Sequence, residues 1–124
     1  MPINMELIDG GNVLWVQING DWKPEDIAPA KEQTQRIFKQ AQHPIHSLVD
    51  LRHASVNIPL IRASQQVIGG EALPNAGQIA VVGVPWLIRA VAEPILRASN
   101  PNDPISFFNS IEDAQKHLRR FFKV

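Results

Sequence analysis

Four residues whose side chains can do chemistry lie close together in the middle of the chain: Asp50, Arg52, His53 and Ser55. They follow an apolar segment that predicts a strand and precede a segment that predicts a helix. Open α/β sheets bind ligands at this position, where free amides at a helix start favour an anion. Arg52 can hold an anion with two hydrogen bonds, and His53 titrates near neutral pH. The alternative is that Asp50 only accepts backbone hydrogen bonds, while Arg52 and His53 are solvated.

The same residues do not predict an enzyme. Asp50, His53 and Ser55 are neighbours on one loop, and such neighbours rarely place a nucleophile, a base and an orienting carboxylate in line. The sequence contains no Gly-x-Ser-x-Gly motif, no Gly-x-Gly-x-x-Gly motif and no Gly-Lys-Ser/Thr phosphate loop. Acid–base chemistry by His53 and Asp50 stays an alternative that requires a deep pocket and shifted pKa values. We therefore expect no catalytic residues.

Metal binding is also not expected. His43, His46 and His53 lie near Asp50 in the sequence, and imidazole and carboxylate groups suit zinc. However, His43 and His46 stand on either side of Pro44, where a helix passes into a strand, so nothing makes their rings point the same way. The chain has no cysteine, which removes thiolate sites, iron–sulfur ligation and disulfides. We expect no metal and no cofactor.

The composition predicts a single domain that spans residues 1–124. A chain of this length buries roughly two thirds of its unfolded surface, so folding needs no metal or disulfide. The formal net charge is zero, which argues against DNA or RNA as a partner. There is no leader-like start and no apolar run of about 20 residues, so we expect neither export nor a membrane span. Together with the lack of cysteine, this predicts a cytoplasmic protein.

Apolar runs alternate with segments of helical period, and this pattern of βαβ units predicts the α/β class. Two runs flank Asp9–Asn12, whose glycines tolerate the positive φ of a tight turn, so the chain should open with an antiparallel hairpin. Asn57 and Ser110 are expected helix N-caps, and Pro29 fits the first turn of a helix that follows Asp26. The expected strands are Ile3–Ile8, Val13–Asn19, Ile45–Leu51, Ile79–Gly83 and Ile105–Phe108, and the expected helices are Ile27–Ala41, Ile58–Ile68, Trp86–Ala98 and one that starts at Ile111.

The third expected helix shows spacing that predicts one apolar face toward the core and one charged face toward solvent. An enclosed cavity under the apolar face would favour a small-molecule ligand. The expected inner residues are Leu87, Ile88, Val91 and Ile95, and the expected outer residues are Arg89, Glu93 and Arg97.

Two tryptophans are candidates for an interaction surface. Val13, Trp15 and Gln17 share one face of the second strand, because side chains alternate along a strand. If helices cover only the other face there, Val13 and Trp15 form an exposed apolar patch suited to a partner or to self-association. Trp22, in the loop before the first helix, belongs to the same surface or covers the end of the sheet. The alternative is burial of both tryptophans within the monomer.

Several short motifs occur in a characteristic order: Val49–Arg52 at a strand end, Leu73–Gly77 before the fourth strand, Leu87–Arg89 in the third helix and Phe107–Ala114 near the end. In these motifs and in its order of elements, nearly the whole chain resembles the STAS-like group of anti-sigma-factor antagonists, and within it the bacterial STAS/SEC14 type. The resemblance implies a mixed, mostly parallel five-stranded sheet with an N-terminal β-hairpin and four helices. It also implies a partner-binding, regulatory role.

The resemblance further implies where a regulatory serine would lie. In anti-sigma-factor antagonists of this fold, that serine belongs to an Asp-Ser-Ser/Thr-Gly type segment at the start of the second helix. The matching segment here is Ser55–Pro59, which has no hydroxyl at Asn57 or Ile58 and no glycine. Ser55 is the nearby hydroxyl, and a phosphate on it would be held by helix amides and Arg52.

We therefore predict a non-enzymatic protein-interaction or regulatory module of STAS-like type that forms a homodimer or binds a protein partner. The alternative, from the SEC14 side of the resemblance, is a domain that binds a small anionic or lipid-like ligand. Because a full SEC14 domain is much longer, only a shallow ligand site is expected. The residues expected to contact a partner or ligand are Trp15, Trp22, Arg52, His53 and Ser55.

Overall fold

A computed structural model describes residues 2–68, 74–99 and 105–122, with the side chains of 95–99 left out of the description. The described residues form five strands and four α-helices, in which the sheet and the hairpin agree with the prediction. The strands are β1 (Ile3–Ile8), β2 (Val13–Ile18), β3 (Ile45–Asp50), β4 (Ala76–Val82) and β5 (Ile105–Phe108). The helices are α1 (Ile27–Gln40), α2 (Ile58–Ile68), α3 (Trp86–Ser99) and α4 (Ile111–Arg119).

The sheet has its strands in chain order, β1-β2-β3-β4-β5. β1 pairs with β2 in the antiparallel direction, and the remaining pairs are parallel. The hairpin loop contains a short 3₁₀ turn over Asp9–Gly11, and Gly10 and Gly11 have φ values of 68° and 86°. These angles explain the glycines of the loop, because glycine adopts them without the steric cost of a Cβ atom. The mixed α/β sheet with an N-terminal hairpin is therefore confirmed.

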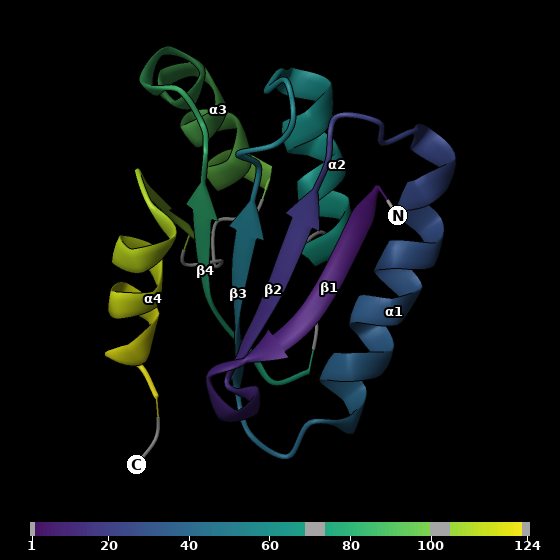
Figure 1. The fold of residues 1–124 in the computed structure, drawn as a ribbon, viewed down its shortest axis with the longest axis vertical. Helices are drawn as coiled ribbons and strands as arrows, with labels where there is room; N and C mark the ends of the chain where they lie inside the picture. The colour runs from purple at the N-terminus through teal and green to yellow at the C-terminus, as the bar shows by residue number, and fades with distance from the viewer. Residues whose placement is uncertain (1, 69–73, 100–104, 123–124) are drawn as a thin grey trace.

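The chain order of the strands determines which face each helix covers. Each parallel step from β2 to β5 is a crossover to the next strand in the same direction, and such crossovers are right-handed. They therefore place α1, α2 and α3 on one face of the sheet, as Figure 1 shows. No strand follows α4 in the described residues, and α4 packs on the opposite face against β3, β4 and β5.

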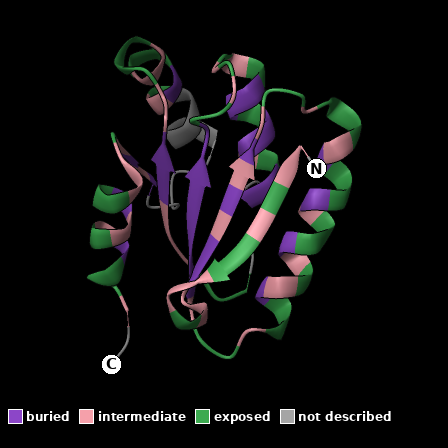
Figure 2. Ribbon diagram, viewed as in Figure 1, coloured by how far each residue is buried: buried purple, intermediate pink, exposed green. Residues whose placement is uncertain are grey.

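One helix is too narrow to cover the face on which α4 lies. A helix with its side chains is about 10 Å wide and strands are about 4.8 Å apart, so one helix covers about two strands. β3, under α4, is buried along its whole length, whereas β1 is exposed or half-buried at every position (Figure 2). Among the described residues, no helix therefore lies over the half of this face formed by β1 and β2.

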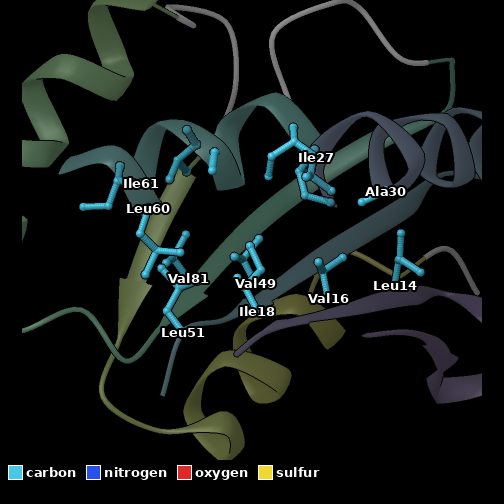
Figure 3. Close-up of a cluster of buried hydrophobic side chains, with 14 of the residues drawn as sticks. Leu14, Val16, Ile18, Ile27, Ala30, Val49, Leu51, Leu60, Ile61 and Val81 are labelled. Atoms are coloured by element: carbon cyan, nitrogen blue, oxygen red, sulfur yellow. The ribbon is translucent and has the colours of Figure 1, made fainter. Parts of the chain in front are cut away.

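The main core lies between the sheet and helices α1 to α3 (Figure 3). Phe38 of α1 and Leu60 of α2 are almost completely buried there, against strand residues such as Val16. A second, smaller core lies under α4, where Leu118 packs over Leu48. Each sheet face thus has an apolar layer of its own, and the layer under α4 is the narrower one.

Two of the predicted helix caps are confirmed by hydrogen bonds. The Asn57 side chain accepts the Leu60 N–H at 2.9 Å, and the Ser110 hydroxyl accepts the Asp113 N–H at 3.1 Å. Asp26 precedes α1 as predicted, but its carboxylate makes no capping bond to that helix. It accepts the N–H of Lys23 at 2.8 Å instead, which closes a short 3₁₀ turn before α1.

The predicted inner face of α3 is wrong in part, because Ile88 packs against the main core as predicted but Leu87 and Val91 do not. Leu87 and Val91 are 62% and 54% exposed, and Trp86 at the start of the helix is 78% exposed. Ala92 is buried instead, and the guanidinium of Arg89 lies over the Phe107 ring at 5.2 Å from its centroid. This cation–π contact brings a predicted solvent residue onto the sheet, while Leu87 and Val91 face outward. Leu87 and Val91 therefore do not line the interior of the described part of the fold. Two further residues of the pattern, Ile95 and Arg97, lie outside the described side chains.

Candidate functional site: an uncovered face of the sheet

The uncovered half of the sheet presents a small group of mostly polar side chains. Cross-strand pairing places Glu6 opposite Trp15 and Asn4 opposite Gln17. These four side chains point to the α4 side, because their neighbours along each strand pack into the main core. They border a hollow of about 120 Å³, together with Met5. Such a volume is below the roughly 300 Å³ of a typical small-molecule site.

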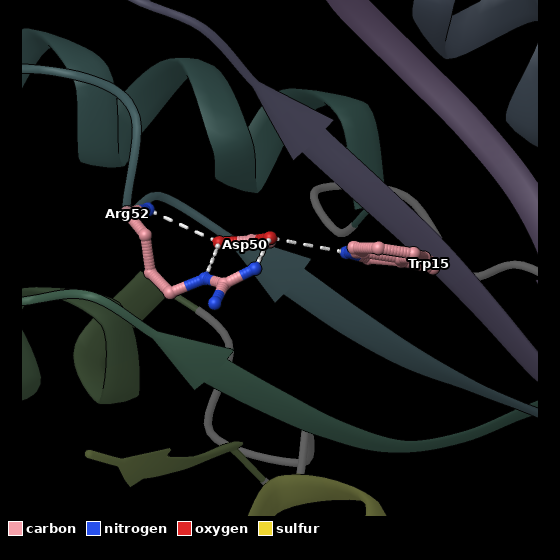
Figure 4. Close-up of polar contacts among 3 residues, drawn as sticks. All are labelled: Trp15, Asp50 and Arg52. Carbon is pink, nitrogen blue, oxygen red and sulfur yellow. Dashed lines mark hydrogen bonds and ion pairs between the residues drawn. The ribbon is translucent and has the colours of Figure 1, made fainter. Parts of the chain in front are cut away.

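Trp15 is held in place by a buried carboxylate at the end of β3. Its indole Nε1–H donates to Asp50 Oδ2 at 3.2 Å, and Asp50 is completely buried. Arg52 donates to the same carboxylate from Nε at 2.9 Å, from its terminal nitrogen at 3.0 Å and from its backbone N–H at 3.1 Å. Figure 4 shows Asp50 between the two side chains, with Trp15 on one side and Arg52 on the other. We call these three residues the Asp50 clamp.

The clamp explains how a buried carboxylate stays ionised. Burial by itself raises the pKa of Asp50, but hydrogen bonds and the positive charge of Arg52 outweigh this effect, with a smaller contribution from the Trp15 N–H. The net result is a pKa below the ordinary value of an aspartate. The same bonds raise the pKa of Arg52. Asp50 and Arg52 are therefore an ion pair, and their charges cancel at the edge of the uncovered face.

The backbone around the clamp is fixed by a close approach between two loops. Gly83, just after β4, has a φ of 97°, and a Cβ atom there would lie 2.7 Å from the Arg52 backbone nitrogen. The Leu51 N–H donates to the Val82 carbonyl at 2.9 Å. A glycine at this position is therefore required both by its φ and by the contact with the Arg52 backbone.

The structure does not gather all the predicted site residues. Arg52 belongs to the clamp, but His53 and Ser55 are exposed in the following loop. In the part of the chain that the structure describes, no hydrogen bond or ion pair involves the side chain of either residue, although the His53 carbonyl accepts the Gly20 N–H at 3.0 Å. Arg52 uses its guanidinium on Asp50 rather than presenting it alone to an anion.

The predicted apolar patch is wrong in one residue. Val13 is completely buried, because the core under α4 extends over the start of β2. Trp15 is partly buried at the margin of that core and partly exposed on the uncovered face. Trp22 packs against the main core on the opposite side of the sheet, so the two tryptophans do not share one surface.

His46 is a buried polar residue that the sequence analysis considered only as a metal ligand. It is 5% exposed, its Nδ1 accepts the Gln78 N–H at 2.8 Å, and its ring stacks on Phe122 at 5.7 Å between centroids. Burial lowers the pKa of His46, and a hydrogen bond to the Phe121 backbone opposes this only in part. A Cβ on Gly77 would collide with the imidazole, so that glycine makes room for it. Within the described residues, no group of three potential ligands is placed to hold a metal.

The fold is STAS-like: a five-stranded sheet with one antiparallel pair, four helices and α4 alone on its face. A similar solved structure is a variant of RsbS from Moorella thermoacetica in which a serine is replaced by glutamate, with a TM-score of 0.62 over 97% of both chains. RsbS is a STAS-domain anti-sigma-factor antagonist. At 9% sequence identity, the likeness concerns the fold. No protein-family model and no curated protein sequence matches the chain.

None of the helices in the described residues is both long enough and apolar enough to cross a membrane.

Proposed function

We propose that this protein is a non-enzymatic, cytoplasmic interaction module of regulatory type, which docks a protein partner on the uncovered face around Trp15. One observation carries the proposal: a partly exposed tryptophan is held by a buried carboxylate on a sheet face that no helix covers. The STAS-like fold and its likeness to an anti-sigma-factor antagonist support a regulatory role.

The make-up of the face suits a transient interface. Interfaces that form and dissociate have a central anchor, often Trp or Arg, surrounded by a polar rim. Trp15 is such an anchor, and Asn4, Glu6 and Gln17 form a polar rim around it. Arg52 borders the face next to the anchor and remains a proposed contact. We also retain Trp22, His53 and Ser55 as proposed contacts, although they lie outside this face.

Self-association fits a different surface, the outer side of α3. Trp86, Leu87 and Val91 are exposed there, together with Ala90, and none of them carries a charge. Permanent homodimer interfaces are more apolar than transient ones, and burying these side chains in two copies removes on the order of 1,000 Å² from water. That area is close to the lower limit of a specific interface. We propose that the protein forms a homodimer through α3.

Sedimentation velocity combined with native mass spectrometry tests the homodimer. We expect a dimer for the wild type and a monomer for Leu87→Glu, which places a charge in the apolar face. Gln33→Glu, which changes an exposed residue on α1, should leave the dimer intact. A wild type that stays monomeric at all accessible concentrations contradicts the homodimer.

Comparative affinity purification from the source cells tests the partner face. We expect Gln17→Arg, which fills the uncovered face with a long side chain, to lose a partner that the wild type and Gln33→Glu both retain. If all three proteins recover the same partners in the same amounts, or if none of them recovers any, the uncovered face is not a docking site.

A further inference from the structure

The hollow on the uncovered face combines three kinds of chemical group. The exposed Glu6 carboxylate and the Trp15 indole face each other across the strand pair, and the side-chain amides of Asn4 and Gln17 lie next to them. The side chain of Met5 packs into the main core on the other face, so Met5 contributes backbone to the hollow. An anion, an aromatic face and amide oxygens together suit a cation that has a flat shape and several N–H donors.

We infer that this hollow receives the guanidinium group of an arginine side chain from a protein partner. The inference rests on the proposed function, because it assumes that the uncovered face docks a protein. It assigns the first specific contact to that face and predicts that the docking segment of the partner is basic.

Charge is the first argument for a cation. Glu6 is exposed, and its carboxylate forms no ion pair or hydrogen bond within the part of the chain that the structure describes. Asp50 is also negative, but Arg52 neutralises it at 2.9 Å. The hollow therefore carries the single negative charge of Glu6, which attracts a positive group on the partner.

Shape selects arginine over lysine. A guanidinium is planar, stacks on an aromatic face and directs its N–H donors outward in one plane, whereas the ammonium group of lysine is a compact point charge. In this hollow, stacking on Trp15 leaves those donors free to reach the Glu6 carboxylate and the Gln17 amide oxygen. The Asp50 clamp fixes the indole before the partner arrives, which reduces the entropy lost on binding.

The test is a titration followed by the NMR signals of the indole N–H groups. The probes are N-acetylarginine amide, N-acetyllysine amide and N-acetylcitrulline amide, of which citrulline has nearly the shape of arginine without its charge. The Trp15 signal is assigned by elimination from Trp22→Phe and Trp86→Phe, because neither change touches the uncovered face. We expect a saturable shift of the Trp15 signal with the arginine probe, and binding at least about five-fold weaker with citrulline.

Two matched variants separate a specific contact from general attraction. Glu6→Gln should weaken binding of the arginine probe by about three-fold, whereas Glu112→Gln, an exposed change on α4, should leave it unchanged. Equal binding of arginine and citrulline, an unaltered affinity of Glu6→Gln, or no shift of the Trp15 signal overturns the inference. If Gln17→Arg loses a protein partner that Glu6→Gln fully retains, the docking face stands and only the arginine contact is wrong.

Discussion

The two halves of one sheet face contrast sharply. Under α4, the strands carry apolar residues such as Leu48 and Val82, and these are completely buried. On β1 and β2, the same face carries Glu6 and Gln17 in the equivalent outward positions, and they are exposed or half-buried. Trp15 lies at the boundary and takes part in both, because one part of it packs at the margin of the core and another part lines the hollow.

This difference shows that the number of helices on a sheet face limits how many of its strands are covered. The strand order places three crossover helices on one face, so of the helices in the described residues only α4 covers the other. Polar side chains on β1 and β2 suit a surface that no described helix covers. Trp15 is the exception on that surface, and it needs a functional explanation. The following substitutions test whether the two halves differ in stability and in binding.

The largest effect is expected for Leu118→Ala in the covered half. Leu118 is completely buried, and removing its side chain leaves a cavity under a helix of only nine residues. We expect the free energy of unfolding to fall by about 3 kcal/mol. Leu7→Ala is the matched control, because Leu7 is 46% exposed and should change stability by less than about 1 kcal/mol. Urea denaturation of both variants measures the difference, and equal losses would contradict the burial of α4.

The second effect concerns the boundary between the halves. Asp50→Asn keeps the shape of the carboxylate but turns part of it into a donor that faces the N–H groups of Trp15 and Arg52. We expect a loss of about 2 kcal/mol, less than for a fully buried pair because the Arg52 side chain is 42% exposed. Asp21→Asn, in an exposed loop, is the control and should have no effect. A displaced NMR signal of the Trp15 indole should accompany the loss, and an unmoved signal would mean that the clamp does not hold the tryptophan.

The third effect is a pH dependence in the covered half. Since the pKa of His46 is lowered in the folded state, the unfolded chain binds the proton more readily. The stabilisation by neutral His46 is therefore complete above its unfolded pKa of about 6.5. It is lost as the pH falls toward the folded pKa, with a slope of at most about 1.4 kcal/mol per pH unit.

Denaturation between about pH 7.5 and pH 5.5 measures this slope. His46→Gln should reduce it, whereas His43→Gln, on the exposed loop before β3, should not. Asp50 acts at lower pH, because its lowered pKa provides stability that is present above the unfolded value of about 3.9 and lost below it. The same slope in wild type and His46→Gln would show that another group titrates.

The smallest effect is expected in the uncovered half. Gln17→Ala removes a partly exposed side chain, so the free energy of unfolding should change by less than about 0.5 kcal/mol. Binding of the arginine probe should nevertheless weaken, because an amide oxygen of the hollow is lost. If stability falls as much as in Leu118→Ala, β1 and β2 are not an independent surface and the contrast between the halves fails.

Features that depend on neighbours along the chain could be predicted from the sequence. The hairpin follows from the loop at Asp9–Asn12, and the caps Asn57 and Ser110 form the expected bonds. The position of Asp50 and Arg52 at the end of β3 was also predicted, because strand ends and helix starts are local signals, and Asp50 accepts a backbone N–H as the alternative interpretation expected. The direct bond from Arg52 to Asp50 needs only two residues of separation, but the sequence analysis directed Arg52 to an external anion instead.

Features that depend on distant contacts could not be predicted. The apolar pattern of α3 fits two rotations of the helix, and the contact between Arg89 and Phe107 decides between them. The bond from Trp15 to Asp50 joins residues 35 positions apart. The burial of His46 depends on Phe122 and Gly77, neither of which is adjacent in sequence. None of these contacts leaves a periodic signal.

The lone position of α4 also has a consequence for folding during synthesis. Because α4 follows β5 in the chain, every strand of the sheet leaves the ribosome before the helix that covers this face. Val13, Leu48, Ala80 and Val82 then form an apolar strip that is bare until α4 docks. Such transiently exposed strips are where nascent chains aggregate or recruit chaperones. The docking of α4 therefore decides whether this face of the sheet is covered or associates with other chains.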